Sequence, residues 1–338
     1  MIREVCSALA DGAVIPPGGI AAAFSDLVSG SATPAQMGAF LFALRTHTPN
    51  EYDLFGCAKI LLSHAKPLDV SGSGQAVDTC GTGGDSSMTF NISTAAAFVT
   101  AGAGIPVLKH GNRAVTSRSG SADVLAAIGI VSASSQDEAG SALQNAGIAF
   151  LSARDYHPAL LRLAGVRSEL GFRTIFNIVG PLSHPAGPIN RILGISDPAL
   201  LLPMAGALRS LGVSHAMVVS GGELDELSLH GENRICELKS GMISEYMLKA
   251  EDLGLSSAPV DVLRADSPQE SAEIIRRVLN GEEGPCRDIV LFNAAGAILV
   301  GGGATTFPSA LTMAEQSIDS GMAADSLQHL LEIQRGSR

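Results

Sequence analysis

The chain has 338 residues, of which 46% are hydrophobic and only 16% charged, and its formal net charge is -11. This length and composition can bury one large core with a smaller appendage, or two domains, and they exclude a disordered chain. The acidic balance and the lack of a long Lys/Arg run exclude general nucleic-acid binding, so local cations, backbone N–H groups or a metal must hold any anionic ligand.

The sequence predicts neither a membrane span nor a secreted chain. No apolar run reaches the ~18–20 residues that a span requires, and residues 1–10 lack a signal-peptide core. The five cysteines are scattered and never spaced C-x-x-C, which indicates a reducing cytoplasm rather than a zinc site or a disulfide framework.

Residues 1–70 are predicted to be entirely helical and to form one small domain. Thr33-Pro34-Ala35-Gln36 is a capping box with proline at the first helical position, and apolar residues follow at helical spacing. Thr48-Pro49-Asn50-Glu51 repeats the device and opens a second helix. The short link between these helices predicts a helical hairpin.

After a Gly/Ser-rich stretch at 71–74, which we interpret as a hinge, short apolar strands alternate with helices. Strands are expected at 76–78, 105–108, 148–151, 189–195 and 216–220. Helices are expected at 93–103, 121–128, 136–145, 198–211, 269–279, 288–299, 308–317 and 322–333. The alternation predicts an α/β domain over 71–338 with a mainly parallel central sheet. Ligands of such sheets lie beyond the carboxyl ends of the strands, so the residues after each strand are the candidates for chemistry.

The first candidate segment, 78–94, has the sequence DTCGTGGDSSMTFNIST and holds three glycines within four residues, Gly81, Gly83 and Gly84. Glycines let successive N–H groups turn inward, and a following helix N-terminus adds partial positive charge, so the segment could hold a pyrophosphate. The spacing matches neither G-x-G-x-x-G nor the P-loop. The alternative is a tight structural turn before a capped helix.

The second candidate segment, 109–123, has the sequence KHGNRAVTSRSGSAD and follows a predicted strand directly. It collects cations and hydroxyl or amide donors with little apolar surface, so it could wrap a phosphate and a ribose. The alternative is a solvated surface loop.

The third candidate segment, 222–229, has adjacent carboxylates at Asp225 and Glu226 in a turn after a strand. Magnesium usually pairs one or two carboxylates with substrate phosphates. A carboxylate pair facing a glycine-rich, cationic loop therefore indicates a metal between them and an anionic ligand. A solvated acidic turn is the alternative.

The fourth candidate segment, 157–186, carries Arg162, Arg167 and Arg173 in a helix-like sequence. A planar guanidinium suits bidentate recognition of a carboxylate, although each arginine could instead be a surface ion-pair partner. His157 and His184 are interpreted mainly as packed or capping residues.

These motifs together carry a family resemblance. GTGGD, TFNIST, KHGNR, RSGSADVL, RxELGxRTxFN and LDELSL, in this order and at these separations, resemble the anthranilate phosphoribosyltransferase family from about Thr33 to the carboxyl end. Two small departures are Ser86 and Ser87, which stand where a glycine is common, and the sequence VRSELGF around Arg167.

The resemblance implies a nucleoside phosphorylase/phosphoribosyltransferase-like fold, with a small all-helical domain and a larger α/β domain. Roughly 160–183 would complete the helical domain, and a homodimer through it would explain an apolar face around Phe40 and Leu44. The implied reaction, in tryptophan biosynthesis, transfers the phosphoribosyl group of 5-phosphoribosyl 1-pyrophosphate to the amine of anthranilate and releases pyrophosphate. The implied cofactor is Mg2+.

The resemblance also implies residue roles. The donor would contact Gly81, Gly84, Asp85, Thr89, Asn91, Ile92, Ser93, Thr94, Lys109, His110, Gly111, Asn112, Arg113, Ser117 and Ser121. Anthranilate would contact Gly81, Asn112, His157 and Arg167, and magnesium would bind Ser93, Asp225 and Glu226. The catalytic roles would fall to Lys109, Asn112, Arg167 and His110, through stabilisation of the departing pyrophosphate and alignment of the amine.

Three alternatives stay open at this point. A pyrimidine nucleoside phosphorylase would share the architecture, but the KHGNR motif and the carboxylate pair favour a pyrophosphate donor. A diverged phosphoribosyltransferase-like protein could act on another amine or bind nucleic acid, although a nucleic-acid-binding form should be basic. A non-enzyme of the same fold would have no need of all four candidate segments.

Overall fold

The computed structural model describes residues 1–69, 76–85, 87–111, 120–187 and 189–336. The predicted hinge at 71–74 and the predicted domain boundary at residue 70 lie outside these residues, so both stay predictions. In the described part of the chain, no helix is long and apolar enough to cross a membrane.

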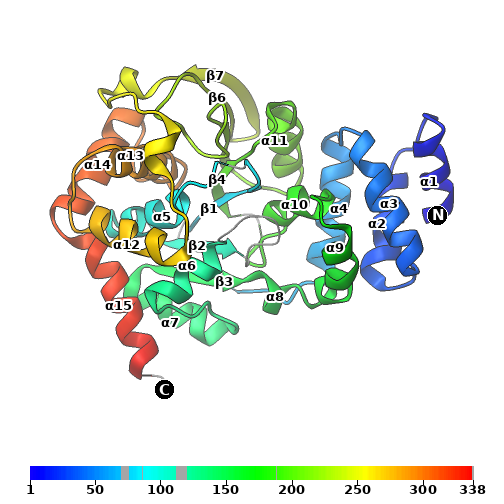
Figure 1. The fold of residues 1–338 in the computed structure, drawn as a ribbon, viewed down its shortest axis with the longest axis horizontal. Helices are drawn as coiled ribbons and strands as arrows, with labels where there is room; N and C mark the ends of the chain where they lie inside the picture. The colour runs from blue at the N-terminus through cyan, green and yellow to red at the C-terminus, as the bar shows by residue number, and fades with distance from the viewer. Residues whose placement is uncertain (70–75, 86, 112–119, 188, 337–338) are drawn as a thin grey trace.

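A bundle of helices occupies one end of the molecule and a helix-covered sheet the rest (Figure 1). The bundle begins with α1 (Ile2–Ala10), α2 (Gly19–Ser29), α3 (Pro34–Ala43), the 3-10 helix η1 (Leu44–Thr46) and α4 (Glu51–Ser63). A later segment returns to it through α8 (Ala153–Tyr156), η2 (Pro158–Leu163), α9 (Ala164–Leu170), α10 (Ile175–Val179) and η3 (Gly180–Leu182). In Figure 1 the green α9 and α10 lie beside the blue α4.

Two helix starts in the bundle show how local sequence fixes the elements. The Thr33 hydroxyl accepts from the Gln36 N–H and the Gln36 side chain accepts from the Thr33 N–H, which confirms the predicted capping box. The second predicted start was wrong in detail, because the helix begins after Asn50. The Asn50 side chain accepts from the Asp53 N–H and the Asp53 carboxylate accepts from the Asn50 N–H, so Pro49 precedes the cap.

The apolar face predicted around Phe40 and Leu44 is not free. Phe40 and Leu44 are 0% and 6% exposed, in a core formed with other helices of the same chain. They lie on one stripe of α3 and η1 because they are four residues apart, and the bundle itself covers that stripe. The exposed aromatic side chains of this region are instead Phe42 and Tyr52.

The sheet has seven strands, in the order β3-β2-β1-β4-β5-β6-β7. The five parallel strands, all predicted, are β1 (Val77–Gly81), β2 (Val107–Gly111), β3 (Ile148–Ser152), β4 (Asn190–Gly194) and β5 (His215–Ser220). The antiparallel strands β6 (Asn233–Lys239) and β7 (Met242–Leu248) were not predicted. The strand order reverses between β1 and β4, because β2 and β3 lie on one side of β1 and β4 and β5 on the other. Open α/β sheets bind their ligands at such a switch point.

Helices cover both faces of this sheet. The parallel strands are connected by α5 (Ile92–Gly102), α6 (Ser121–Ile128), α7 (Gln136–Ala146), η4 (Pro198–Leu200) and α11 (Leu201–Ser210). The chain ends with η5 (Ala250–Leu253), η6 (Val260–Leu263), α12 (Pro268–Leu279), α13 (Pro285–Val300), α14 (Phe307–Asp319) and α15 (Met322–Gly336). In Figure 1, α12 to α15 lie at the end opposite the N-terminal helices.

Strand alternation divides the interior into two cores. Ile192 and Met217 point into the core that holds α5 and the C-terminal helices, whereas their neighbours Leu193 and Val218 point into the core that holds the bundle and α11. The bundle is therefore packed against one face of the sheet, next to the carboxyl ends of β1 and β4.

Candidate active site

The carboxyl ends of β1 and β4 carry paired glycines because another part of the chain crosses directly over them. Gly81 and Gly194 are register partners. A Cβ atom on Gly81 would lie 2.6 Å from the Asp225 Oδ2 atom, and one on Gly194 would lie 2.5 Å from the Asp225 carbonyl carbon. Only glycine leaves room for the turn after β5 to fold back over both strand ends. This turn brings the acidic pair to the switch point.

Both carboxylates contact the first candidate segment, 78–94. Asp225 Oδ2 accepts a hydrogen bond of 2.5 Å from the Gly83 N–H, and Glu226 Oε1 accepts one of 3.2 Å from the Ser93 N–H. Burial, followed by the neighbouring charges of Asp85 and Glu226, raises the pKa of Asp225 well above its usual value. Burial also raises the pKa of Glu226 to about 7, against the opposing effect of Lys109. Crowded, desolvated carboxylates of this kind favour binding of a cation.

Lys109 completes the junction. Its side chain is 4% exposed, and its ammonium donates to the Thr79 carbonyl and, over 3.2 Å, to the Ser93 hydroxyl. Ser93 thus contacts Lys109 from β2 and Glu226 from the turn after β5, while standing in the first turn of α5. Three segments that lie far apart in the chain meet at this one serine.

The start of α5 is held in place from outside the helix. The Asn91 side chain makes no capping bond to α5. The backbone N–H of Asn91 instead donates to the Ser271 hydroxyl of α12 over 2.9 Å. The Ile92 side chain is buried in the core, so a donor contact at this residue would fall to its backbone. The Thr94 hydroxyl is fully buried and has no hydrogen-bond partner among the described residues. A buried hydroxyl without a partner is costly unless a ligand supplies one.

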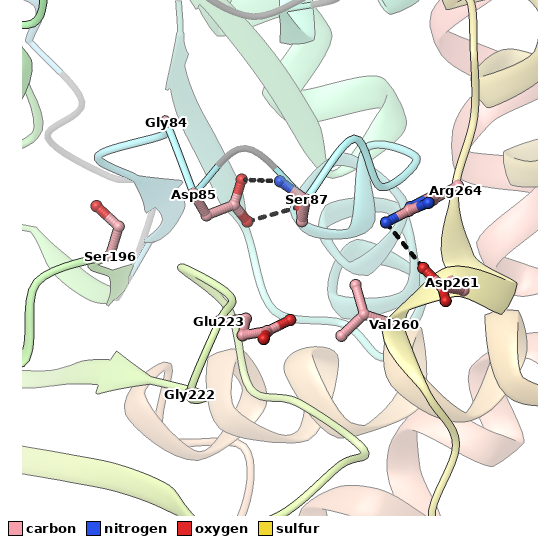
Figure 2. Close-up of a pocket in the computed structure, with 9 residues that line it drawn as sticks. All are labelled: Gly84, Asp85, Ser87, Ser196, Gly222, Glu223, Val260, Asp261 and Arg264. Carbon is pink, nitrogen blue, oxygen red and sulfur yellow. Dashed lines mark hydrogen bonds and ion pairs between the residues drawn. The ribbon is translucent and has the colours of Figure 1, made fainter.

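The glycine loop continues along a cavity of about 540 Å³, a size typical of small-molecule sites. On one wall, Asp85 accepts hydrogen bonds from the N–H and the hydroxyl of Ser87, and on another Arg264 pairs with Asp261 at 2.8 Å (Figure 2). Thr89 pairs with Arg264 through an isolated β-bridge. The cavity is lined by Gly84, Asp85, Ser87, Ser196, Gly222, Glu223, Val260, Asp261 and Arg264.

A cluster of buried histidines lies at the end of β2. The His110 ring lies 5.2 Å from the His157 ring and 5.5 Å from the His184 ring, measured between centroids. Burial lowers the pKa of all three imidazoles, and that of His184 falls to about 4. All three are therefore neutral near pH 7. His157 Nε2 donates to the Ser183 carbonyl, which fixes its ring beside His110.

The remaining predicted site residues fall into three groups. Gly111 approaches Ser121, because a Cβ atom on the glycine would lie 2.5 Å from the serine hydroxyl. Arg167 stacks its guanidinium 5.4 Å above the Phe176 ring centroid, and burial lowers its pKa; within the described ranges, no contact joins it to the Lys109–Ser93–Glu226 junction. The predicted residues Asn112, Arg113 and Ser117 lie outside the described residues.

The sequence did not single out two residues that shape the site. Gly194 could have been found, because it lies one residue before the end of the predicted strand 189–195. Arg173 could not be separated from the other arginines of its segment, yet its guanidinium donates to the Thr82 carbonyl over 2.8 Å and to the Ser196 hydroxyl over 3.3 Å.

Comparison with known proteins agrees with this geometry. Residues 3–65 match the helical bundle domain of the glycosyl transferase family, and residues 73–324 match its a/b domain. The fold is that of a glycosyl transferase with a helical bundle and a mostly parallel sheet.

Individual relatives indicate which glycosyl transferases this chain resembles. The chain is 43% identical to the anthranilate phosphoribosyltransferase of Methanosphaerula palustris and 44% identical to that of Chloroflexus aurantiacus, with 99% of each chain covered in both comparisons. The crystal structure of anthranilate phosphoribosyltransferase from Thermus thermophilus superposes with a TM-score of 0.89 at 36% identity, covering 98% of this chain and 99% of that one. The Saccharomyces cerevisiae enzyme in complex with 5-phosphoribosyl 1-pyrophosphate and Mg gives 0.86 at 27% identity, covering 98% and 97%.

The chain belongs to the anthranilate phosphoribosyltransferases, transferases of tryptophan biosynthesis. This confirms the resemblance, fold class and activity predicted from the motifs.

Proposed function

We propose that phosphoribosyl transfer to the amine of anthranilate takes place at the switch point between β1 and β4. The observation that carries this proposal is the junction at Ser93, which contacts Lys109 on one side and Glu226 on the other. A metal-bound diphosphate needs a glycine loop, a cation and carboxylates, and here hydrogen bonds join these three components.

The donor's pyrophosphate would lie against the glycine loop and the N-terminus of α5. Backbone N–H groups there carry partial positive charge that favours an anion. The Thr94 hydroxyl, which has no partner in the described structure, would donate to a phosphate oxygen. The cavity beside Asp85 gives the donor room to extend.

The residues at the junction also fit Mg2+. Asp225, Glu226 and the Ser93 hydroxyl offer the oxygen ligands that this ion prefers. A cation would also offset the unfavourable free energy of burying two negatively charged carboxylates. Across the described part of the chain, no group of three or more His, Cys, Asp or Glu side chains could hold a metal by itself, so donor phosphates would complete the coordination. When bound, the ion would neutralise charge on the departing pyrophosphate.

The chain's own groups account for the remaining chemistry. Lys109, fixed by Thr79 and Ser93, stabilises negative charge on the leaving group. The Arg167 guanidinium is suited to the anthranilate carboxylate. Because burial lowers the pKa of His110 and His157, these imidazoles are poorly matched to act as general bases near pH 7. The amine therefore loses its proton after attack, to pyrophosphate or water.

Anthranilate fluorescence tests the proposal directly. The signal should fall when the protein receives 5-phosphoribosyl 1-pyrophosphate and Mg2+, and Glu226→Gln should slow the fall most at limiting Mg2+. Glu232→Gln is the matched control, because Glu232 is exposed and pairs with Lys249 on the surface. Phosphate-dependent cleavage of thymidine, with no loss of anthranilate, would instead establish a nucleoside phosphorylase.

We further propose a homodimer that forms through the helical bundle. The support is the exposure of two aromatic side chains of the bundle, Phe42 in α3 and Tyr52 in α4, which are 63% and 74% exposed. Sedimentation of Phe42→Glu should shift from dimer towards monomer, whereas a wild-type chain that sediments as a monomer would reject the dimer. The cytoplasmic location stays a prediction, supported by five free cysteines.

A further inference from the structure

Arg173 reaches the glycine loop from the bundle side. Its Nη2 atom donates to the Thr82 carbonyl over 2.8 Å, and its Nη1 atom donates to the Ser196 hydroxyl over 3.3 Å. The guanidinium also fills the space beside Gly84, where a Cβ atom would collide with it. One face of the loop is therefore shaped by this side chain.

The opposite face of the same peptide is held by Asp225. The Thr82 carbonyl and the Gly83 N–H belong to one planar peptide unit, and the N–H donates to Asp225 Oδ2. Arg173 and Asp225 thus fix the two ends of a single peptide. A rotation of that peptide would turn the Thr82 carbonyl, which repels anions, towards the proposed donor side.

The backbone of Arg173 is in turn anchored to the N-terminal helices. Arg45 Nη1 donates to the Arg173 carbonyl over 3.0 Å, and the Arg45 guanidinium stacks 5.3 Å above the Phe172 ring centroid. The Phe42 ring of α3 contacts Phe172 edge-on. The orientation of one loop peptide is therefore linked through Arg173 to the docking of the bundle.

We propose that Arg173 is a positioning residue for the donor: it holds the Thr82 carbonyl on the bundle side, so that this carbonyl does not face the pyrophosphate. The identity of this ligand rests on the proposed function. Arg45 contributes indirectly, because it anchors the backbone that carries the Arg173 side chain.

Steady-state kinetics of Arg173→Gln test this role, with separate KM values for donor and anthranilate. Loss of a charged hydrogen bond predicts a donor KM that rises by about tenfold to a hundredfold, while the anthranilate KM changes less than about twofold. Arg173→Lys should be intermediate, because it restores the charge and one of the two contacts.

The matched control is Arg162→Gln. Arg162 belongs to the same crossover segment and donates to the Ser29 carbonyl, but no described contact joins it to the glycine loop. Its donor KM should stay at the wild-type value. Equal effects of the Arg162 and Arg173 variants, or an equal rise in both KM values, would overturn the inference.

A double-mutant cycle of Arg45→Gln and Arg173→Lys tests the link between the loop peptide and the bundle. This cycle can be measured even if Arg173→Gln fails to fold. Arg45→Gln should raise the donor KM by a smaller factor, and this factor should be smaller again in an Arg173→Lys background, where only one of the two side-chain contacts depends on the anchored backbone. Independent effects would reject the link. If the wild-type protein itself does not consume anthranilate, the proposed function fails; if it does and the Arg173 variants match it, only this inference fails.

Discussion

Gly194→Ala is expected to damage the site through steric displacement rather than through lost chemistry. The new Cβ atom would collide with the Asp225 carbonyl oxygen and lie 2.5 Å from the carbonyl carbon, whereas ordinary contact begins near 3.4 Å, so the main chain at Asp225 must move by at least about 0.9 Å. Overpacking of this kind costs about 1–3 kcal/mol of folding stability. A misplacement of about 1 Å can reduce a rate roughly 100-fold.

The assay is kcat/KM for the donor, measured by anthranilate fluorescence, with thermal unfolding measured in parallel. We expect kcat/KM to fall by about 100-fold, with part of the loss recovered at high Mg2+. Gly140→Ala adds the same methyl group in α7, where a Cβ atom would meet nothing within 4 Å, and it should retain full activity. Wild-type kcat/KM in a folded Gly194→Ala protein would refute the placement of the acidic turn.

Three further outcomes follow from burial and charge. Glu226→Gln should raise the Mg2+ concentration for half-maximal rate at least about tenfold, and Glu232→Gln should not; equal responses would contradict the metal site. Thr94→Val should leave the unfolding free energy measured in urea unchanged or raise it by up to about 1 kcal/mol, because the hydroxyl has no described partner. The donor KM should rise in the same variant. A large stability loss would show that the hydroxyl is already paired. Burial lowers the pKa of His184 from 6.5 to about 4, so the folded state binds fewer protons than the unfolded state between these pH values, and stability falls as pH falls. At about pH 5.5 the lowered pKa of His184 reduces the unfolding free energy by about 1.4 kcal/mol relative to neutral pH and above. The unfolding free energy should therefore depend less steeply on pH in His184→Asn than in the wild type, and parallel curves for the two proteins would contradict this.

The parallel part of the fold could be predicted because buried parallel strands are short apolar runs between helices. The same rule located Lys109, Asp225 and Glu226, since each follows a strand. The hairpin of β6 and β7 escaped prediction because β7 is mostly exposed and mixes charged with apolar side chains. Its signal was the turn at Ser240 and Gly241, which both have positive φ, as tight hairpins require.

Other features depend on tertiary packing that local sequence does not contain. Helical spacing placed Phe40 and Leu44 on one apolar face, which we expected a second copy to cover, but it did not show that the same chain covers this face. Nothing local separates Arg173 from Arg162. The packing of the crossover segment against α2 and α3 directs Arg173 to the glycine loop and Arg162 to the surface of the bundle.

The central claim is that the carboxylate turn and the junction at Ser93 hold the metal-bound donor. Its most direct test is anomalous scattering from crystals soaked with 5-phosphoribosyl 1-pyrophosphate and Mn2+ in place of Mg2+. We expect a manganese peak within coordination distance of oxygens from Asp225 or Glu226, with a phosphate of the donor beside the glycine loop. A well-occupied donor whose manganese contacts neither carboxylate would contradict it.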